Sequence, residues 1–404
     1  MRLSDGTHLG YCTNIHPGES WVEVRAILER AVPRVRQRLG RSGRFGVGLR
    51  LAAAAADTLC EDDTAFAQLA HILAQHDLYV FTINGFPHGA FHATRVKENV
   101  YRPDWAEPER LRYSNRLADL LVRLLAEGET GSISTVPGAF KPRAADPAAV
   151  DAIADGLIRH AAHLARLAGE TGRTVVLALE PEPCCLLETI AETVAFFHDR
   201  LFARAAVARM AALAGLDAGG AEAALRRHLG VCLDACHAAV EFEDPLAAID
   251  RLAAEGIAIA KLQLSCGLAV APLTAERRAA LAAFGDPVYL HQVVQRLGEA
   301  GDVTRFLDLP DALAAVEEAA EPENAMREWR VHFHVPIFRA ELPPFASTQS
   351  FLAALLHRQR QRPIAPHLEV ETYTWDVLPA AYRDEGTASA IARELAWALE
   401  RLAP

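Results

Sequence analysis

The sequence predicts an α/β fold, a TIM (β/α)8-type barrel with a late β-hairpin insertion, and three observations indicate it. Short apolar runs alternate with alanine- and leucine-rich segments of helical periodicity along 404 residues. They follow one another as strand, helix, strand, an order that produces parallel strands joined by crossover helices. Polar residues gather at the C-terminal ends of the apolar runs, where α/β barrels place their chemistry.

Nine apolar runs are predicted to be strands. They are short and rich in β-branched residues, as expected of strands that are covered on both faces. A barrel of this type holds eight strands, so at least one of the nine is misassigned or lies outside the wall. In chain order the runs are 9–15, 45–51, 78–86, 131–138, 174–183, 230–237, 257–265, 329–337 and 367–375.

The segments between these runs carry apolar residues at helical spacing. Successive strands are roughly 30 to 50 residues apart, which fits βα units. An open doubly wound sheet is disfavoured because no glycine-rich fingerprint follows the first strand. Gly10 stands alone, and GRFGVG precedes a strand and opens no helix. The predicted helices are 20–39, 63–76, 110–128, 149–172, 188–201 and 245–256.

One late segment interrupts the alternation. Two alternating runs, 288–297 and 302–309, are joined by the turn sequence GEAG. This pattern is typical of a β-hairpin. We therefore expect a single barrel domain over 1–404, with 270–325 inserted into it and shaping a lid or an interface.

Composition excludes several classes of protein. With 51% hydrophobic and 23% charged residues, the chain is expected to be globular with a large core. The net charge of −11 argues against a nucleic-acid partner. The N-terminus lacks a signal-peptide pattern, and no apolar run is long enough for a membrane span. Seven cysteines without a framework of spacings suit a reducing compartment, so we expect a cytoplasmic protein; its oligomeric state is left open, a homo-oligomer included.

Several predicted strands end in carboxylates or histidines. Residues two apart on a strand face the same side, so His332 and His334 are expected to share a face. Each position also has a structural interpretation: a solvated loop carboxylate, a helix cap for Asp234, or a packed imidazole. The strand-end residues are Glu180, Glu182, Asp234, His237, Lys261, Gln263, His332, His334, Glu369 and Glu371.

Carboxylates and neutral imidazoles together suit a divalent metal ion. Such a shell favours Mn²⁺, Co²⁺ or Zn²⁺ and serves Mg²⁺ less well. Carboxylates that converge in a barrel mouth repel one another, and a cation relieves that repulsion. Serine nucleophile elbows, Walker loops and HExxH motifs are absent from the sequence. The sequence therefore predicts one divalent metal ion at the mouth of the barrel.

The strand-end motifs resemble a known superfamily. LALEP, LDACH and EVETY, in this order, are similar to the xylose-isomerase-like TIM barrels, which include sugar epimerases and isomerases and the endonuclease IV type. YCTNIHPGESW, TINGFPHGAFH followed by VKENVYRPDW, and RVHFHVPIF resemble the EboE-type metabolite-traffic proteins, a branch of that superfamily. The second likeness extends over most of the chain.

The resemblance implies metal ligands at Glu180, Asp234 and Glu371, with His237 close by in the substrate pocket. The superfamily's remaining ligand is a histidine on the seventh strand, but this chain has Gln263 there. A neutral amide binds metal weakly, so His334 is favoured as the fourth ligand, with His332 as support. The likeness leaves both Gln263 and His334 open.

The resemblance also implies a chemistry. A metal ion acting as a Lewis acid would acidify a C–H beside a carbonyl, and Glu180 and Glu371 would remove and return the proton. Lys261 is a candidate for stabilising the enediolate oxygen or binding a phosphate; the alternative is a salt bridge at the barrel mouth. The predicted substrate-binding residues are Asn14, Asn84, His88, Gln263 and His332.

Three functions compete at this stage. The first is a metal-dependent isomerase or epimerase of a small polyhydroxylated or carbonyl metabolite. The second is a protein that binds and hands over a metabolite without turning it over. The third, an endonuclease IV-like enzyme, needs a richer histidine set and a basic face, which this acidic chain lacks.

Overall fold

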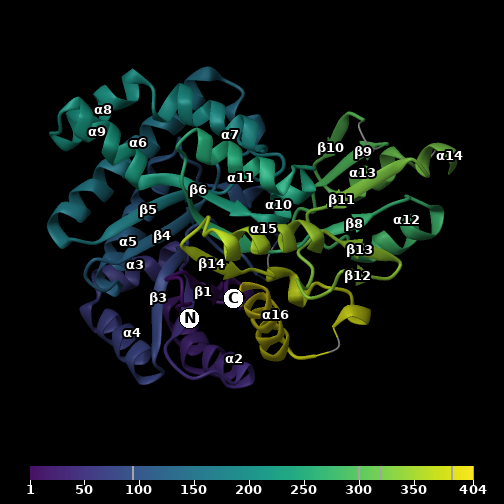
Figure 1. Ribbon diagram of the computed structural model, residues 1–404, viewed down its shortest axis with the longest axis horizontal. Helices are drawn as coiled ribbons and strands as arrows, with labels where there is room; N and C mark the ends of the chain where they lie inside the picture. The colour runs from purple at the N-terminus through teal and green to yellow at the C-terminus, as the bar shows by residue number, and fades with distance from the viewer. Residues whose placement is uncertain (93–94, 299–300, 318–320, 384, 404) are drawn as a thin grey trace.

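A computed structural model describes residues 1–92, 95–298, 301–317, 321–383 and 385–403. Eight parallel strands form a nearly closed barrel in the order β1-β14-β7-β6-β5-β4-β3-β2 (Figure 1). A bridge between Cys12 and Gly48 links β1 to β2 across the remaining gap. The predicted TIM-type barrel is therefore confirmed. Its strands are β1 (His8–Tyr11), β2 (Phe45–Arg50), β3 (Leu78–Asn84), β4 (Thr130–Thr135), β5 (Thr174–Leu179), β6 (Leu229–Asp234), β7 (Ile259–Leu264) and β14 (His367–Val370).

A second, antiparallel sheet lies beside the barrel, at the right of Figure 1. It contains the predicted hairpin, in which β9 pairs with β10; residues 299–300 of the connecting GEAG lie outside the described residues. The sheet reaches beyond 270–325, because it also takes in strands on both sides of that range. Its strands are β8 (Leu268–Val270), β9 (Val293–Leu297), β10 (Val303–Phe306), β11 (Arg327–Val331), β12 (Glu341–Leu342) and β13 (Phe345–Ser347).

The run 329–337 is the predicted strand that is not in the barrel wall. Its first part belongs to β11, which pairs with β9 and β8 in the second sheet. The wall has no place for it, because β14 pairs directly with β7. The strand ends at Val331, and His332 and His334 lie in the connection between β11 and β12 of the second sheet.

Helices surround the barrel, and the sequence signals at their N-termini explain where several begin. Ser20 and Glu23 form a capping box, and Asp146 caps a helix whose first residue is Pro147. The barrel helices are α1 (Trp21–Ala26), α2 (Val32–Leu39), α3 (Ala53–Glu61), α4 (Asp63–Gln75), α5 (Pro108–Leu124), α6 (Pro147–Thr171), α7 (Ile190–Phe196), α8 (Arg204–Ala214), α9 (Ala218–His228), α10 (Ala235–Val240), α11 (Pro245–Ala254), α15 (Gln349–Gln361) and α16 (Thr387–Leu402).

Shorter helical segments complete the connections. The π-helical turns η2 and η5 extend α1 and α7, so the predicted helix 20–39 is divided into α1, η2 and α2. Among the described helices, none combines the length and apolar character needed to cross a bilayer. The remaining segments are η1 (Thr13–Ile15), η2 (Ile27–Ala31), η3 (Lys97–Tyr101), η4 (Lys141–Ala144), η5 (Phe197–Leu201), α12 (Ala275–Leu281), η6 (Ala282–Phe284), α13 (Leu309–Ala315), α14 (Glu321–Asn324), η7 (Tyr373–Asp376) and η8 (Ala380–Tyr382).

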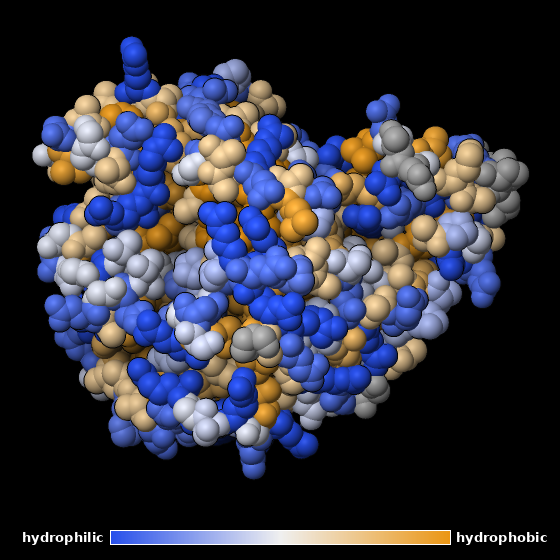
Figure 2. Space-filling view, in the orientation of Figure 1, coloured by the Kyte–Doolittle hydropathy of each residue, from blue (hydrophilic) through white to orange (hydrophobic). Residues whose placement is uncertain are grey.

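On the face of the molecule that Figure 2 shows, exposed apolar side chains are scattered, and two of the buried cysteines lie in small apolar clusters. Figure 2 shows hydrophilic side chains interspersed with small hydrophobic patches on one face. Scattered exposed apolar residues of this kind are normal for a folded chain. Cys232 and Cys236 are buried within small apolar clusters.

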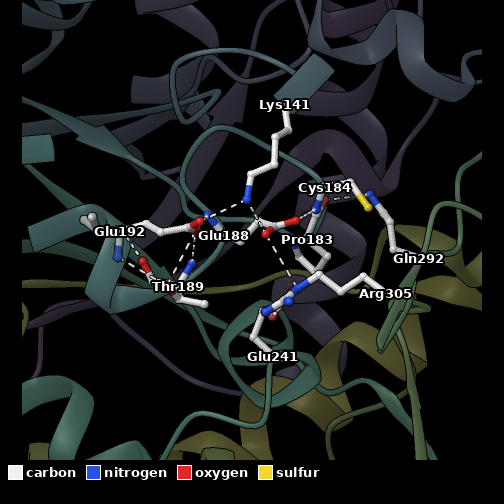
Figure 3. A network of polar contacts seen from close by, with 10 residues as sticks. Lys141, Pro183, Cys184, Glu188, Thr189, Glu192, Glu241, Gln292 and Arg305 are labelled. Carbon is white, nitrogen blue, oxygen red and sulfur yellow. Dashed lines mark hydrogen bonds and ion pairs between the residues drawn. The ribbon is translucent and has the colours of Figure 1, made fainter. Parts of the chain in front are cut away.

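A network of charges docks the second sheet on the barrel (Figure 3). Arg305 of β10 donates from Nη2 to Glu241 Oε2 at 2.5 Å, and its Nε lies 3.5 Å from Glu188 Oε2. Lys141 also pairs with Glu188 and donates to Glu192 Oε1 at 2.9 Å. The inserted strands are therefore held by ion pairs to two different barrel connections.

Candidate metal centre and substrate cavity

Three carboxylates meet at the C-terminal mouth of the barrel. Glu180 follows β5, Asp234 ends β6 and Glu371 follows β14. One oxygen from each lies within 4.8 Å of the other two, and none of the three residues is more than 5% exposed. Glu180 and Glu371 are 191 positions apart in the sequence. They converge because parallel barrel strands end at one rim.

Two of the three carboxylates, those of Asp234 and Glu371, are oriented by different sets of donors. Asp234 Oδ1 accepts from the His237 backbone N–H at 3.0 Å, which caps α10, and from Ser265 Oγ at 2.6 Å. Glu371 Oε1 accepts from Asn14 Nδ2 at 2.6 Å and from Asn84 Nδ2 at 2.8 Å. These contacts hold the carboxylates in place and leave other oxygens uncommitted.

The uncommitted atoms are buried. Glu180 Oε2, Asp234 Oδ2 and His334 Nε2 have no hydrogen-bond partner among the described residues. A buried acceptor without a partner costs free energy, and a carboxylate costs more than a neutral group. These buried acceptors therefore suit a divalent cation.

The electrostatics lead to the same conclusion. Burial raises the pKa of Glu180 well above its ordinary value, and the charges of Glu371 and Asp234 raise it further. Burial, followed by Asp234 and Glu369, raises the pKa of Glu371 to about 8. Like charges that cannot all ionise either keep protons or bind a cation.

His334 lies beside this cluster. Its Nδ1 donates to the Glu371 carbonyl oxygen at 2.5 Å, so the neutral ring carries its lone pair on Nε2. Ligand atoms of Asp234, His237 and His334 lie within 4.8 Å of one another. A histidine whose other nitrogen is held by a carbonyl is typical of metal sites, and His334 as the fourth ligand stays a prediction.

Gln263 faces the same cluster from β7. It is register-paired with Asp234 on β6 and is fully buried, and neither amide atom has a hydrogen-bond partner among the described residues. Both residues that the sequence left open are thus close to the carboxylates. The choice between His334 and Gln263 stays a prediction, with His334 favoured by its free lone pair.

His237 and His332 form a pair of hydrogen-bond acceptors. His237 Nδ1 donates to the Pro181 carbonyl at 3.0 Å, and His332 Nδ1 donates to Gln292 Oε1 at 2.8 Å. In the neutral rings both Nε2 atoms then carry lone pairs, and they lie 3.1 Å apart. Burial, followed by neighbouring histidines, lowers the pKa of each ring well below its ordinary value. The pair suits a donor such as a substrate hydroxyl, or a cation.

Two further sets of ligand atoms meet within 4.8 Å in the described part of the chain. One is Glu182 with His237 and His332, and the other is Cys236 with His332 and His334. Burial raises the pKa of the Cys236 thiol, which favours its protonated form. The carboxylate set therefore remains the better candidate for the metal ion.

Gln292 is a site residue that sequence reasoning missed. It immediately precedes β9 of the inserted sheet; its Nε2 donates to Tyr101 Oη at 2.7 Å and to the Pro183 carbonyl at 3.2 Å, and lies 3.3 Å from Glu182 Oε1. Burial raises the pKa of Glu182 to about 8. In the sequence, the only signal for this residue is a polar His-Gln pair just before the apolar part of a hairpin strand. The sequence does not show which residues the pair contacts.

Three predicted catalytic or substrate-binding residues, Lys261, His88 and Gln263, are not among the residues that line the cavity. Lys261 forms a fully buried ion pair with Glu369 and does not line the cavity, so the structure favours the salt-bridge alternative over contact with a substrate. His88 is half-buried, packs its ring against Tyr113 with centroids 4.9 Å apart, and is likewise not part of the cavity wall.

A cavity opens beside the carboxylate cluster. It holds about 540 Å³ of space between atoms, part of which is open to solvent. Most of the predicted acidic, amide and imidazole residues reach it. Its walls are Asn14, Asn84, Phe86, Pro87, Phe91, Val96, Lys97, Val100, Tyr101, Glu180, Glu182, His237, Tyr289, Leu290, His332, Glu371 and Tyr373.

Comparison with known proteins gives the fold but no close relative. No protein-family model matches the chain, and no curated protein matches its sequence. The structure of L-ribulose 3-epimerase has a TM-score of 0.50 at 15% identity, with 98% of this chain and 94% of that chain covered.

Two further solved structures are similar over nearly the whole chain. A xylose isomerase-like TIM barrel protein from Mycobacterium smegmatis in complex with magnesium has a TM-score of 0.49 at 12% identity, covering 100% of this chain and 98% of that one. The IOLI protein with a bound zinc atom has a TM-score of 0.44 at 9% identity, with 98% of each covered. The EboE-type subgroup stays a prediction. The likeness to L-ribulose 3-epimerase, at 15% identity, shows the TIM-barrel fold alone.

Proposed function

We propose that the protein is a divalent-metal-dependent isomerase or epimerase of a small polyhydroxylated or carbonyl compound. The observation that carries the proposal is the convergence of Glu180, Asp234 and Glu371 beside a cavity, with buried acceptor atoms that no described residue satisfies. A purely structural cluster of acids would be neutralised by lysine or arginine. Among the described residues, Glu180, Asp234 and Glu371 form no ion pair with a lysine or an arginine.

Glu180, Asp234 and Glu371 would hold the ion, with His334 as the fourth ligand. When bound, Mn²⁺, Co²⁺ or Zn²⁺, or less readily Mg²⁺, supplies Lewis acidity to a carbonyl and the hydroxyl beside it. Oxygen ligands from carboxylates and one neutral nitrogen make a suitable shell for these ions.

The chain's own residues orient the substrate and move the proton. Glu180 and Glu371 act as general base and acid at the substrate carbon, and Asn14 and Asn84 keep the Glu371 carboxylate in one orientation. The acceptor pair of His237 and His332 receives hydrogen bonds from substrate hydroxyls. Aromatic walls limit the entry of water, which strengthens these interactions.

Metal analysis tests the first part of the proposal. Protein purified without a histidine tag should contain about one divalent ion per chain, and Asp234→Asn should lose it because a neutral amide is a weak ligand. Asp244→Asn is the matched control, since Asp244 caps α11 and asparagine caps equally well. Full metal occupancy in Asp234→Asn would contradict the ligand assignment.

Solvent isotope exchange tests catalysis. An isomerase or epimerase that abstracts a carbon-bound proton should introduce deuterium from D₂O into a bound ketose, and Glu371→Gln should suppress the exchange. Tight binding of a ligand without exchange would contradict the enzyme proposal and support the metabolite-binding alternative.

A further inference from the structure

One wall of the cavity is aromatic and is not explained by the proton-transfer chemistry. The rings of Phe91, Tyr289 and Tyr373 contact one another, with centroid separations of 5.1 Å, 5.3 Å and 5.2 Å. All three line the cavity. Three packed rings present a broad carbon surface, which binds flat or apolar groups better than hydroxyls.

The hydroxyl of Tyr289 in this wall is already engaged. His92 donates from Nε2 to the Asn14 carbonyl at 2.6 Å, so its Nδ1 accepts from the Tyr289 hydroxyl at 3.0 Å. The Tyr101 hydroxyl donates to Glu182 Oε1 at 2.7 Å. What Tyr289 offers a ligand is therefore its ring.

No free cation lines the cavity in the described part of the chain. Lys97 is the one lysine or arginine among the lining residues, and its Nζ donates to Asp308 Oδ2 at 2.6 Å, to the Tyr289 carbonyl at 2.6 Å and to the Asp286 carbonyl at 3.1 Å. These three bonds use all of its N–H groups. Because Glu180, Glu182 and Glu371 also line the cavity, a phosphate bound away from the metal ion would meet acidic groups without a free lysine or arginine to pair with.

The aromatic wall depends on the inserted segment. The backbone N–H groups of Val96 and Lys97 donate to the Val288 carbonyl at 2.9 Å and 3.0 Å, next to Tyr289. Two connections that are far apart in the sequence, after β3 and before β9, are thereby joined over the barrel mouth. The insertion contributes both the ring of Tyr289 and the partners that neutralise Lys97.

From these contacts we propose that the substrate is uncharged and carries an apolar or aromatic group that packs on Phe91, Tyr289 and Tyr373. Sugar phosphates are excluded from the substrate class. That the polyhydroxylated end of the substrate binds at the carboxylates and histidines follows from the proposed function. That the substrate carries an apolar group follows from the aromatic wall alone.

Binding measurements with matched probes test this proposal. The full-length chain, equilibrated with MnCl₂, is titrated calorimetrically with D-glucose, D-glucose 6-phosphate and phenyl β-D-glucopyranoside. Burial of a phenyl group on the aromatic wall should make the phenyl glucoside bind about tenfold or more tightly than glucose. The phosphate should bind at least about tenfold more weakly than the phenyl glucoside.

Variants of the wall show whether the preference arises there. Tyr289→Ala should remove the preference for the phenyl glucoside, and Tyr289→Phe, which keeps the ring, should retain it. Phe91→Ala is the second variant if Tyr289→Ala melts at a much lower temperature than the unsubstituted chain.

The outcomes separate this proposal from the proposed function. Glucose 6-phosphate binding as tightly as the phenyl glucoside, no detectable binding of the phenyl glucoside, or a phenyl preference that survives both alanine variants would overturn the substrate class. A phenyl preference in a protein that contains no metal would support the aromatic subsite and contradict only the metal-dependent chemistry.

Discussion

Lys261 and Glu369 form an ion pair inside the barrel, and both side chains are fully buried. They lie two residues before Gln263 on β7 and Glu371 on β14, so the pair forms the layer beneath the carboxylate cluster. Burial alone would lower the pKa of Lys261, but the charge of Glu369 raises it. The floor of the site is therefore a neutralised pair, and the acids above it lack such a partner.

Gly48 makes room for that pair. A Cβ at this position would lie 1.3 Å from Glu369 Oε1. We expect Gly48→Ala to lower the free energy of unfolding by about 2 kcal/mol or more, since the buried carboxylate must shift away from Lys261. Thermal and urea unfolding measure this. Gly169→Ala is the control, because Gly169 lies exposed in α6 with no neighbour near a new Cβ, and it should be neutral or stabilising.

The fourth ligand can be decided by substitution at both candidate positions. His334→Ala should weaken metal binding by about tenfold or more, because it removes an imidazole lone pair next to Asp234. Gln263→Leu should change the affinity by less than about threefold, since a neutral amide contributes little. Competition with a chelating dye measures both affinities. A larger loss in Gln263→Leu than in His334→Ala would reverse the assignment.

Glu394 should make stability depend on pH. This residue of α16 is fully buried, and burial raises its pKa from 4.5 to about 7, although bonds from Thr372 Oγ1 and the Ile337 N–H oppose the rise. Between these two values the folded protein keeps a proton that the unfolded chain has released. The free energy of unfolding should therefore fall as the pH rises from about 4.5 to 7.

Glu394→Gln should flatten that fall and stabilise the protein at pH 8 by roughly 2 kcal/mol, because a neutral amide can still accept the same two bonds. Urea unfolding at several pH values measures the change. Glu400→Gln is the control from the exposed face of the same helix and should leave the pH profile as it is. An unchanged slope in Glu394→Gln would show that other groups cause the dependence.

Arg305 should hold the insertion on the barrel. Its removal leaves the fully buried Glu241 side chain without its partner, although burial already raises the pKa of that carboxyl to about 7. We expect Arg305→Ala to destabilise the protein by about 2 kcal/mol and to speed hydrogen exchange in 288–297. Arg327→Ala is the control, since its partners Glu323 and Gln295 both lie within the inserted region. Equal exchange in both variants would argue against a docking role.

The barrel was predictable because its signals are local. Apolar runs of the right length, helical periodicity between them and polar residues at their ends can each be read within a few residues, and eight of nine predicted strands are in the wall. Glu180, Asp234 and Glu371 were found for the same reason: a residue at the C-terminal end of a barrel strand must face the common rim.

Nonlocal contacts decided the rest. Only the tertiary structure showed that the 329–337 run belongs to the second sheet, that Lys261 pairs with Glu369, that His88 packs on Tyr113 outside the cavity wall and that Gln292 bonds to His332. By itself the sequence determined which side chains end the strands, because strand direction and the period of two follow from the backbone. What those side chains face depends on the partners that the fold brings next to them, and spacing along one chain carries no information about that.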